Sequence, residues 1–191
     1  MKKEERTTQN VTNEVISRLS VLAEKGDTEA QVELGICYYS GEGVEQDYEK
    51  AELWLRKAAE QGDALALYNL GELYYETLFC VDAEQFGCRS RKALDCFRLA
   101  AEKGNVNAMF RIGNCYGLGY GTHQNIEEAS KWFRKAAELG HVLAQRSVAI
   151  ESGICGKTEE AVRWYRLAAG QGDEFSQHEL ECYRSRGIIC D

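Results

Sequence analysis

The chain has 191 residues, with eight cysteines and no proline, and its formal net charge at pH 7 is −8. No block of Lys and Arg supplies the positive face that nucleic-acid binders need, so we expect no nucleic-acid partner. The opening residues are polar and no apolar stretch approaches the length of a bilayer-crossing helix, so we expect no membrane partner and a cytoplasmic location.

A short helix-end motif recurs along the chain. Residues 57–63 read KAAEQGD, residues 99–105 read LAAEKGN and residues 135–141 read KAAELGH, and further copies lie on either side. The copies end 32 to 42 residues apart, a period typical of stacked helix pairs in a solenoid. We therefore predict an all-α chain without a sheet. The five copies end at Asp27, Asp63, Asn105, His141 and Asp173.

The motif divides the chain into successive units of one elongated domain, because the composition does not change along it. Residues 1–27 are predicted to hold a polar tail and a capping helix, which Val15, Leu19 and Leu22 mark. The repeats are predicted over 28–63, 64–105, 106–141 and 142–173, with a C-terminal half repeat over 174–191.

Each unit is predicted to begin with a helix of the pattern A-x-x-x-L-G-x-x-Y. A small residue at the glycine position lets a neighbouring helix approach closely. In the second helix an alanine is followed three residues later by tryptophan or cysteine, and we predict that these positions form its buried stripe. The small residues are Gly35, Gly71, Gly113 and Ala149. The second-helix pairs are Ala51 with Trp54, Ala93 with Cys96, Ala129 with Trp132, and Ala161 with Trp164.

Turn residues mark the helix ends. A glycine stands before the last residue of every motif copy, where the left-handed conformation can end a helix. The Asp or Asn that follows can cap the next helix, whereas His141 is expected to cap poorly. Asp47 and Asn125 are predicted caps of the second helices in two units, with Ser90 and Thr158 as their equivalents in the others.

The second unit carries an insertion, since residues 64–105 form a longer unit than the 36 residues of 28–63. Residues 76–88 contain Leu78, Phe79 and Phe86. We predict either a protruding contact loop or a cover for the adjacent helix ends.

These residues carry a resemblance to a known family. The stretch AQVELGICYYSGEGVEQDYEKAELWLRKAAEQGD (residues 30–63) resembles the Sel-one-like repeat (SLR), a relative of the tetratricopeptide repeat. Residues 106–141 match nearly as well, and residues 142–173 are the most degenerate. The resemblance implies a right-handed superhelical α-solenoid of about four helix pairs with half-repeat caps. It also implies a protein-binding role, often as an adaptor.

The first helices carry a second face beside the buried one. By resemblance to tetratricopeptide arrays, this face lines a concave groove in which a peptide, a helix or a protein surface would bind. Val32, Tyr68 and Phe110 share one repeat position, so we expect them to form a row; the competing interpretation is that some of them pack between units. The predicted partner-binding residues are Val32, Ile36, Tyr39, Tyr68, Glu72, Tyr75, Phe110, Asn114, Arg146 and Ile150.

The cysteines are scattered among repeat positions, so we predict reduced structural thiols. If the protein is oxidised, Cys80 with Cys88 and Cys182 with Cys190 are the pairs that could close locally. We expect no metal, because no C-x-x-C or paired His/Cys spacing occurs. We also expect no catalytic residues and no cofactor, because no constellation of acid, base and nucleophile is visible.

We therefore predict a non-enzymatic adaptor or scaffold that binds one protein or peptide partner, with a monomer favoured. One alternative is a cysteine-rich effector or host-interaction protein, exported by a route without a visible N-terminal signal. Another is a bacterial immunity or regulatory protein that masks one enzyme.

Overall fold

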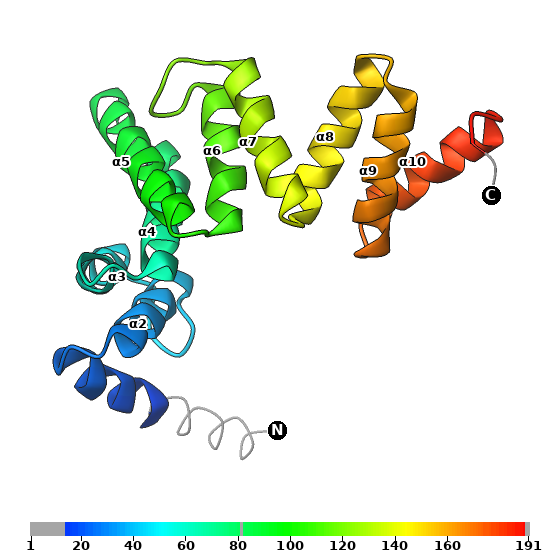
Figure 1. The fold of residues 1–191 in the computed structure, drawn as a ribbon. Coiled ribbons are helices and arrows are strands. Elements are labelled where there is room, and N and C mark those ends of the chain that lie inside the picture. Colours follow the sequence, from blue (N-terminus) through cyan, green and yellow to red (C-terminus); the bar gives the residue numbers. More distant parts are fainter. Residues whose placement is uncertain (1–13, 81, 190–191) are drawn as a thin grey trace. The chain divides into compact units, whose positions relative to one another are not determined.

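The computed structural model describes residues 14–80 and 82–189, and within these ranges all regular structure is helical, as the sequence predicted (Figure 1). A short 3-10 turn, η1 (Thr77–Cys80), separates α4 from α5. None of the helices in the described ranges has the length and apolar content that crossing a bilayer requires. After the helical residues 14–24 come α2 (Thr28–Ser40), α3 (Tyr48–Glu60), α4 (Ala64–Glu76), α5 (Ala83–Glu102), α6 (Val106–Leu118), α7 (Ile126–Glu138), α8 (Val142–Ile154), α9 (Thr158–Gly170) and α10 (Glu174–Ser185).

The helices form two compact units, Met1–Asn105 and Val106–Asp191. Within the first unit α2 packs on α3, α3 on α4 and α4 on α5; within the second, α6 to α10 pack successively in the same way (Figure 1). Because each helix within a unit packs on the next one along the chain, the fold is an all-α solenoid of helix pairs. The single elongated domain predicted from the sequence stays a prediction.

In the first three pairs, the first and second helices approach closely at a glycine. A Cβ atom placed on Gly35 of α2 would lie 2.7 Å from Cγ of Leu55 in α3, closer than real Cβ atoms come to another side chain. The second-helix side chain is therefore seated directly against the backbone of the first helix. The same contact, at 2.5 Å, joins Gly71 to Phe97 and Gly113 to Phe133.

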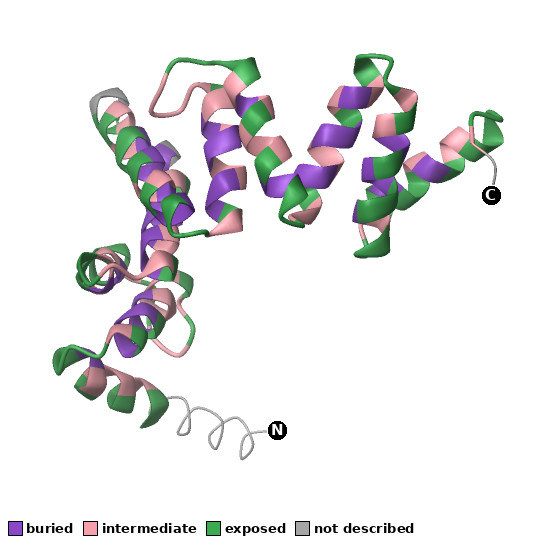
Figure 2. Ribbon diagram, in the orientation of Figure 1, coloured by how far each residue is buried: buried purple, intermediate pink, exposed green. Residues whose placement is uncertain are grey.

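The buried stripe of the second helices includes a position that the sequence analysis missed. Trp54 and Trp132, predicted as buried, are half-buried, and the residue after each tryptophan meets the glycine. Consecutive helical residues point about 100° apart, so the two positions face different neighbours. Trp54 packs against the cluster formed by Ala23, Ala30 and Leu34, towards the preceding helix. Figure 2 shows the buried residues on the sides of the helices that face their neighbours within each unit.

The N-terminal helical segment packs through a face adjacent to the one that the sequence predicted. Leu19 and Leu22 lie against the same cluster, together with Ile16. Val15, predicted to mark this stripe, is 51% exposed. The contact face is therefore rotated from Val15 to Ile16.

The turns between pairs follow the predicted chemistry, with one correction. Gly62 and Gly140 have φ of +85° and +92°, the left-handed conformation that ends a helix. Asp63 then caps α4 by accepting a hydrogen bond from the Ala66 amide at 2.7 Å. His141 was expected to cap poorly, but its Nδ1 accepts from the Ala144 amide at 3.2 Å.

Of the four predicted second-helix caps, two are confirmed and two are wrong. Asp47 accepts from the Lys50 amide at 3.0 Å, and Asn125 accepts from the Glu128 amide, also at 3.0 Å. Thr158 is instead the first residue of α9, where Lys157 occupies the cap position without a side-chain hydrogen bond.

The insertion is helical, which explains why Ser90 is not a cap. It forms η1 and the first turns of α5, so α5 has 20 residues where α3 has 13. Asp82 caps the lengthened helix, and Ser90 lies buried within it. Leu78 is fully buried and Phe86 is half-buried, whereas the Phe79 side chain lies outside the described residues. The described part of the insertion is thus helical with Leu78 in the core, and its role as a contact element or a cover for helix ends stays a prediction.

A glutamine pair that the sequence analysis did not single out, with one buried and one exposed member, joins a helix pair to the helical segment before it. Gln31, 4% exposed, donates through Nε2 to the carbonyl of Ala23 at 3.0 Å. Gln61 in turn donates to Gln31 Oε1 at 2.8 Å, so both amides are hydrogen bonded. The second unit repeats this arrangement with Gln145, Ala137 and Gln171, at 3.2 Å and 2.8 Å.

Replacing Gly71 tests the close approach. Gly71→Ala places a Cβ 2.5 Å from the fully buried ring of Phe97, so the free energy of unfolding should fall by about 1–3 kcal/mol. In the control Gly87→Ala, the nearest atom to the new Cβ is the Arg91 guanidinium at 3.9 Å, and stability should rise by about 0.5–1 kcal/mol. Urea unfolding followed by circular dichroism measures both. Equal midpoints for the two variants would contradict the assignment.

Candidate functional site

The predicted partner-binding residues of α2 differ in exposure. Val32 was expected in an exposed row, but it is 3% exposed and packs with Ala58 and Ala66, where α2, α3 and α4 meet. Ile36 is half-buried against the same cluster. Val32 is therefore mainly a packing residue, because the end of α3 and the start of α4 cover it.

A solvent-open hollow of about 430 Å³ lies over these two residues in the first unit. Its apolar part consists of Val32, Ile36 and Leu65, and Leu65 is 50% exposed. Around them stand the carboxylates of Glu29, Glu33 and Asp63. The hollow thus combines an apolar floor with an acidic rim.

Tyr39 lies at the end of α2. Its ring centroid is 6.2 Å from that of Tyr48, and its hydroxyl donates a hydrogen bond to Glu76. Burial, followed by this hydrogen bond and the nearby carboxylate charges, raises the pKa of Tyr39 above its ordinary value. The phenol therefore stays neutral and is held in place.

The predicted residues of α4 pack towards α5. The ring centroids of Tyr68 and Tyr75 lie 6.1 Å and 6.5 Å from that of Phe97. Both tyrosines are half-buried. Glu72, predicted as a groove residue, is only 7% exposed, because it lies on the packed side of α4. The tyrosines therefore support the core ring of α5 as well as presenting an edge to solvent.

In the second unit Phe110 contacts two rings. It stacks on His141 with centroids 4.5 Å apart and lies 5.5 Å from Phe133. Asn114, one turn further along α6, is half-buried. Burial, and then the charge of Arg111, lower the pKa of His141 below its ordinary value. Phe110 is thus tied to the residue that caps α8.

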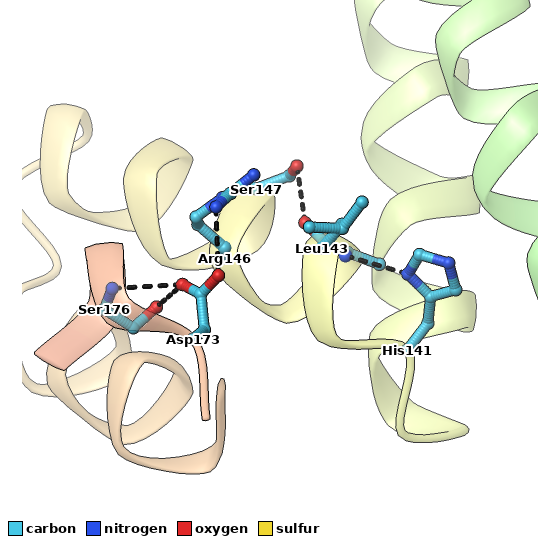
Figure 3. Close-up of polar contacts among 7 residues, drawn as sticks. His141, Leu143, Arg146, Ser147, Asp173 and Ser176 are labelled. Carbon is cyan, nitrogen blue, oxygen red and sulfur yellow. Dashed lines mark hydrogen bonds and ion pairs between the residues drawn. The ribbon is translucent and has the colours of Figure 1, made fainter. Parts of the chain in front are cut away.

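Arg146 of α8 is held by Asp173, which lies in the turn between α9 and α10. Its Nη1 donates to Asp173 Oδ1 at 2.9 Å, while the other oxygen of Asp173 accepts from the amide and hydroxyl of Ser176 (Figure 3). The guanidinium also lies 5.6 Å from the Phe175 ring centroid. Figure 3 shows Arg146 pointing towards Asp173 and Ser176, and the His141 cap at the start of α8. Arg146 is therefore a fixed cation beside exposed apolar surface.

Ile150 belongs to an apolar cavity that the sequence analysis missed. The cavity has a volume of about 270 Å³ and opens on the second unit between the ends of α6 and α8 and the start of α7. Ile126 and Ile154, 61% and 83% exposed, form its rim. Aligning the repeats could have pointed to this place, because Gly117 stands where the first two repeats have a tyrosine. The lining residues are Gly117, Ile126, Ala129, Ser130, Phe133, Ser147, Ile150, Glu151, Ile154 and Cys155.

Within the part of the chain that the structure describes, no three His, Cys, Asp or Glu side chains gather in a way that could hold a metal ion. The Cys182 Sγ lies 3.7 Å from Nε2 of His178, one turn earlier on α10. Cys190 lies outside the described residues, as does the side chain of Cys80, so neither predicted disulfide is tested.

A sequence profile described as the Sel1 repeat matches residues 28–63, 64–82, 90–105, 106–141 and 143–173. The chain belongs to the Sel1 repeat family. The second and third matched segments leave a gap at residues 83–89, which overlaps the insertion.

Two solved Sel1-type structures resemble this chain in fold. The c5321 protein of uropathogenic Escherichia coli, described as a protective antigen with an SLR fold, is 29% identical with a TM-score of 0.79; the match covers 92% of this chain and 37% of that one. A Sel1 repeat protein from Oxalobacter formigenes is 28% identical with a TM-score of 0.76, and the match covers 92% and 71% of the two chains.

Curated relatives are longer proteins. The DAP3-binding cell death enhancer 1 of Rattus norvegicus is 28% identical over 161 residues, 64% of this chain and 30% of the relative. The Arabidopsis thaliana protein named ERAD-associated E3 ubiquitin-protein ligase component HRD3B is 30% identical over 113 residues, 59% of this chain and 17% of the relative. The chain thus spans less than a third of the length of these relatives.

The His141 cap predicts a pH-dependent stability. Because its folded pKa is lowered, the unfolded chain binds more protons below the ordinary value of 6.5, so stability falls as pH drops from there towards the folded pKa. Protonation also removes the lone pair on Nδ1 that accepts from Ala144. The His141→Asn variant keeps a capping oxygen, and its side chain does not titrate. As the pH falls, this variant should therefore lose less stability than the wild type. Urea midpoints at about pH 7.5 and pH 5.5 measure the difference. Equal losses in both proteins would contradict it.

The thiols should differ in reactivity. Burial, and then the charge of Asp95, raise the pKa of Cys96 to about 11, and Cys115 is fully buried. Cys88 and Cys155 are exposed. Iodoacetamide should therefore label Cys88 and Cys155 first in the native protein, because only the thiolate reacts and only accessible sites are reached. Peptide mass spectrometry gives the order.

In denaturant without reductant, all eight thiols should label if the cysteines are reduced. Stable loss of two or more sites would instead support the oxidised form, and the partners of Cys88 and Cys182 would then be mapped first.

Proposed function

We propose that this chain is a non-catalytic protein-interaction module that binds a segment of a protein partner along the exposed faces of its first helices. The observation that carries the proposal is the hollow between α2 and the start of α4, where Val32 and Ile36 are overlaid by solvent-open space. An apolar surface that the chain itself leaves uncovered is typical of a binding site for another chain.

The composition of this surface indicates the partner's chemistry. Leu65 offers an exposed apolar contact, while Glu29, Glu33 and Asp63 supply negative charge around it. The whole chain is also acidic. A partner segment with an apolar side chain flanked by Lys or Arg would match both features, and the opposite charges would speed its association.

The first helices of the second unit offer further contacts. Leu143 and Ile150 of α8 are 40% and 37% exposed, and Phe175 at the start of α10 is 43% exposed. Arg146, held by Asp173, sets a fixed charge among them. We assign these residues to partner contact, with the apolar groups supplying affinity and Arg146 supplying register.

The names of the relatives support a protein partner. One is named as a DAP3-binding protein and another as a component of a ubiquitin-protein ligase. Sel1 repeat proteins are generally scaffolds or adaptors without chemistry of their own. Because the chain spans a minor part of these relatives, their partners are not transferred to it.

Leu65→Asp tests the proposal. The substitution puts a fourth carboxylate into the acidic hollow and removes its exposed apolar group, so capture of the partner in a quantitative affinity purification should fall at least about tenfold. Leu65 is half exposed, so helicity measured by circular dichroism should stay unchanged.

Leu53→Asp is the matched control. Leu53 is 51% exposed on α3, a second helix, and does not line the hollow. It should leave capture unchanged. If both variants retain the same partners at wild-type levels, the first-helix face of this unit is not the binding surface.

A further inference from the structure

One repeat position, four residues after the small residue of the first helix, changes character along the chain. It is Tyr39 in α2, Tyr75 in α4, Gly117 in α6 and Gly153 in α8. What fills the space beside this position decides whether the repeat is closed or hollow there.

In the first repeat the chain's own ring fills the space. Tyr39 lies against Tyr48 at 6.2 Å between centroids and hydrogen bonds to Glu76, and the charge of Glu72 acts on its phenol. These three neighbours come from the start of α3 and from α4. The ring is therefore seated at the junction of α2, α3 and α4.

In the fourth repeat another tyrosine comes close. A Cβ placed on Gly153 would lie 3.3 Å from the hydroxyl oxygen of Tyr183 in α10. The Tyr183 ring also lies 6.2 Å from that of Tyr165. A glycine at this position is thus accompanied by a ring from the next helix.

The third repeat has neither ring, and the apolar cavity of about 270 Å³ lies there. Gly117 takes the place of Tyr39, and Glu151 stands where α10 has Tyr183. The three neighbours of the Tyr39 ring become aliphatic. Ile126 replaces Tyr48, Ile150 replaces Glu72 and Ile154 replaces Glu76, and all three line the cavity.

The size and lining of the cavity suit one aromatic ring. An apolar cavity of about 150 Å³ in a protein interior accommodates benzene, so 270 Å³ holds a ring and its methylene. The hydroxyl of Tyr39 has the Glu76 carboxylate as its partner, whereas the equivalent Ile154 accepts no hydrogen bond. A tyrosine hydroxyl beside Ile154 would lose contact with water without gaining a partner in the chain, so the cavity favours phenylalanine over tyrosine.

The surroundings are negatively charged. Glu151 lines the cavity, held by the Ser130 hydroxyl at 2.6 Å, and the exposed Glu127 follows Ile126 in the first turn of α7. The C-termini of α6 and α8 and the N-terminus of α7 lie at the cavity, so two of these three helix ends favour cations. No Lys or Arg is among the lining residues. A ring that enters should therefore have basic neighbours.

We propose that this cavity is a specificity pocket for a phenylalanine side chain of a partner peptide, with Lys or Arg beside it. The partner's ring takes the place that Tyr39 fills from within the chain in the first repeat. This inference rests on the proposed function and adds to it the side chain that is recognised.

Methyl NMR of the protein with 13C-labelled isoleucine tests the pocket. The probe is the N-acetylated, C-amidated tripeptide lysine–phenylalanine–lysine. Ring-current shifts should appear at the methyl groups of Ile126, Ile150 and Ile154, with a Kd on the order of 1 mM. The same peptide with leucine at the centre should give no ring-current shift. With glutamate in place of both lysines, binding should weaken on the order of fivefold.

Gly117→Tyr supplies the missing ring from within the chain. Gly117 is helical, and a Cβ there would meet only Cβ of Ala129, at an ordinary 3.8 Å, so the variant should fold. It should shift the three isoleucine methyl groups in the free protein and reduce peptide affinity at least tenfold. Gly170→Tyr is the control, because a Cβ at Gly170 meets nothing within 4 Å and Gly170 does not line the cavity.

Ile154→Glu gives an independent readout. Ile154 is 83% exposed, so the change does not disturb the core, and it restores the carboxylate found at Glu76. The preference for phenylalanine over tyrosine in the peptide should then fall or reverse. An unchanged preference would count against the pocket.

The proposal is overturned if the lysine–phenylalanine–lysine peptide shifts none of the three methyl groups up to about 10 mM, or if Gly117→Tyr binds it as the wild type does. Loss of partner capture in Leu65→Asp would in that case still support the proposed function. Unchanged capture in Leu65→Asp would reject the proposed function whatever the peptide does.

Discussion

Each of the first three helix pairs depends on a second-helix side chain that lies directly against the backbone of a first-helix glycine. Leu55 on Gly35 and Phe97 on Gly71 approach to distances that any larger residue would obstruct. The contact brings the two helix axes close together and maximises dispersion contacts along the pair. The remaining features, from turn geometry to surface hollows, are arranged around pairs that this contact holds at a fixed spacing.

The polar groups between pairs reinforce that spacing. Where one pair ends, a left-handed glycine turns the chain and the next residue caps the following helix, as at Gly62 and Asp63. At the junction before α2, the buried Gln31 donates to the carbonyl of Ala23 and accepts from Gln61, so its amide is hydrogen bonded on both sides. Because unpaired buried polar groups are costly, these hydrogen bonds favour one register of stacking over others.

The phenylalanine pocket is proposed where the repeat departs from its own pattern. A position that carries a tyrosine in α2 carries Gly117 in α6, and the carboxylates around the tyrosine become isoleucines. The contact of the second helix with a first-helix glycine is present in both repeats, at Gly35 in α2 and at Gly113 in α6. The scaffold can therefore vary its surface chemistry one turn along the same face of the first helix, from Gly113 to Gly117, while the contact of Gly113 with Phe133 is kept.

The sequence by itself determined the all-α fold, the family, the glycine positions of close helix approach and most caps, because these depend on local periodicity and on residue types with fixed conformational preferences. The tertiary structure decided which predicted groove residues are exposed. Val32 and Glu72 are buried, because burial depends on how a neighbouring helix packs and not on the sequence periodicity of the helix that carries the residue. It also revealed the cavity at Gly117, because an absent side chain leaves a space only where no neighbouring helix supplies a ring to fill it.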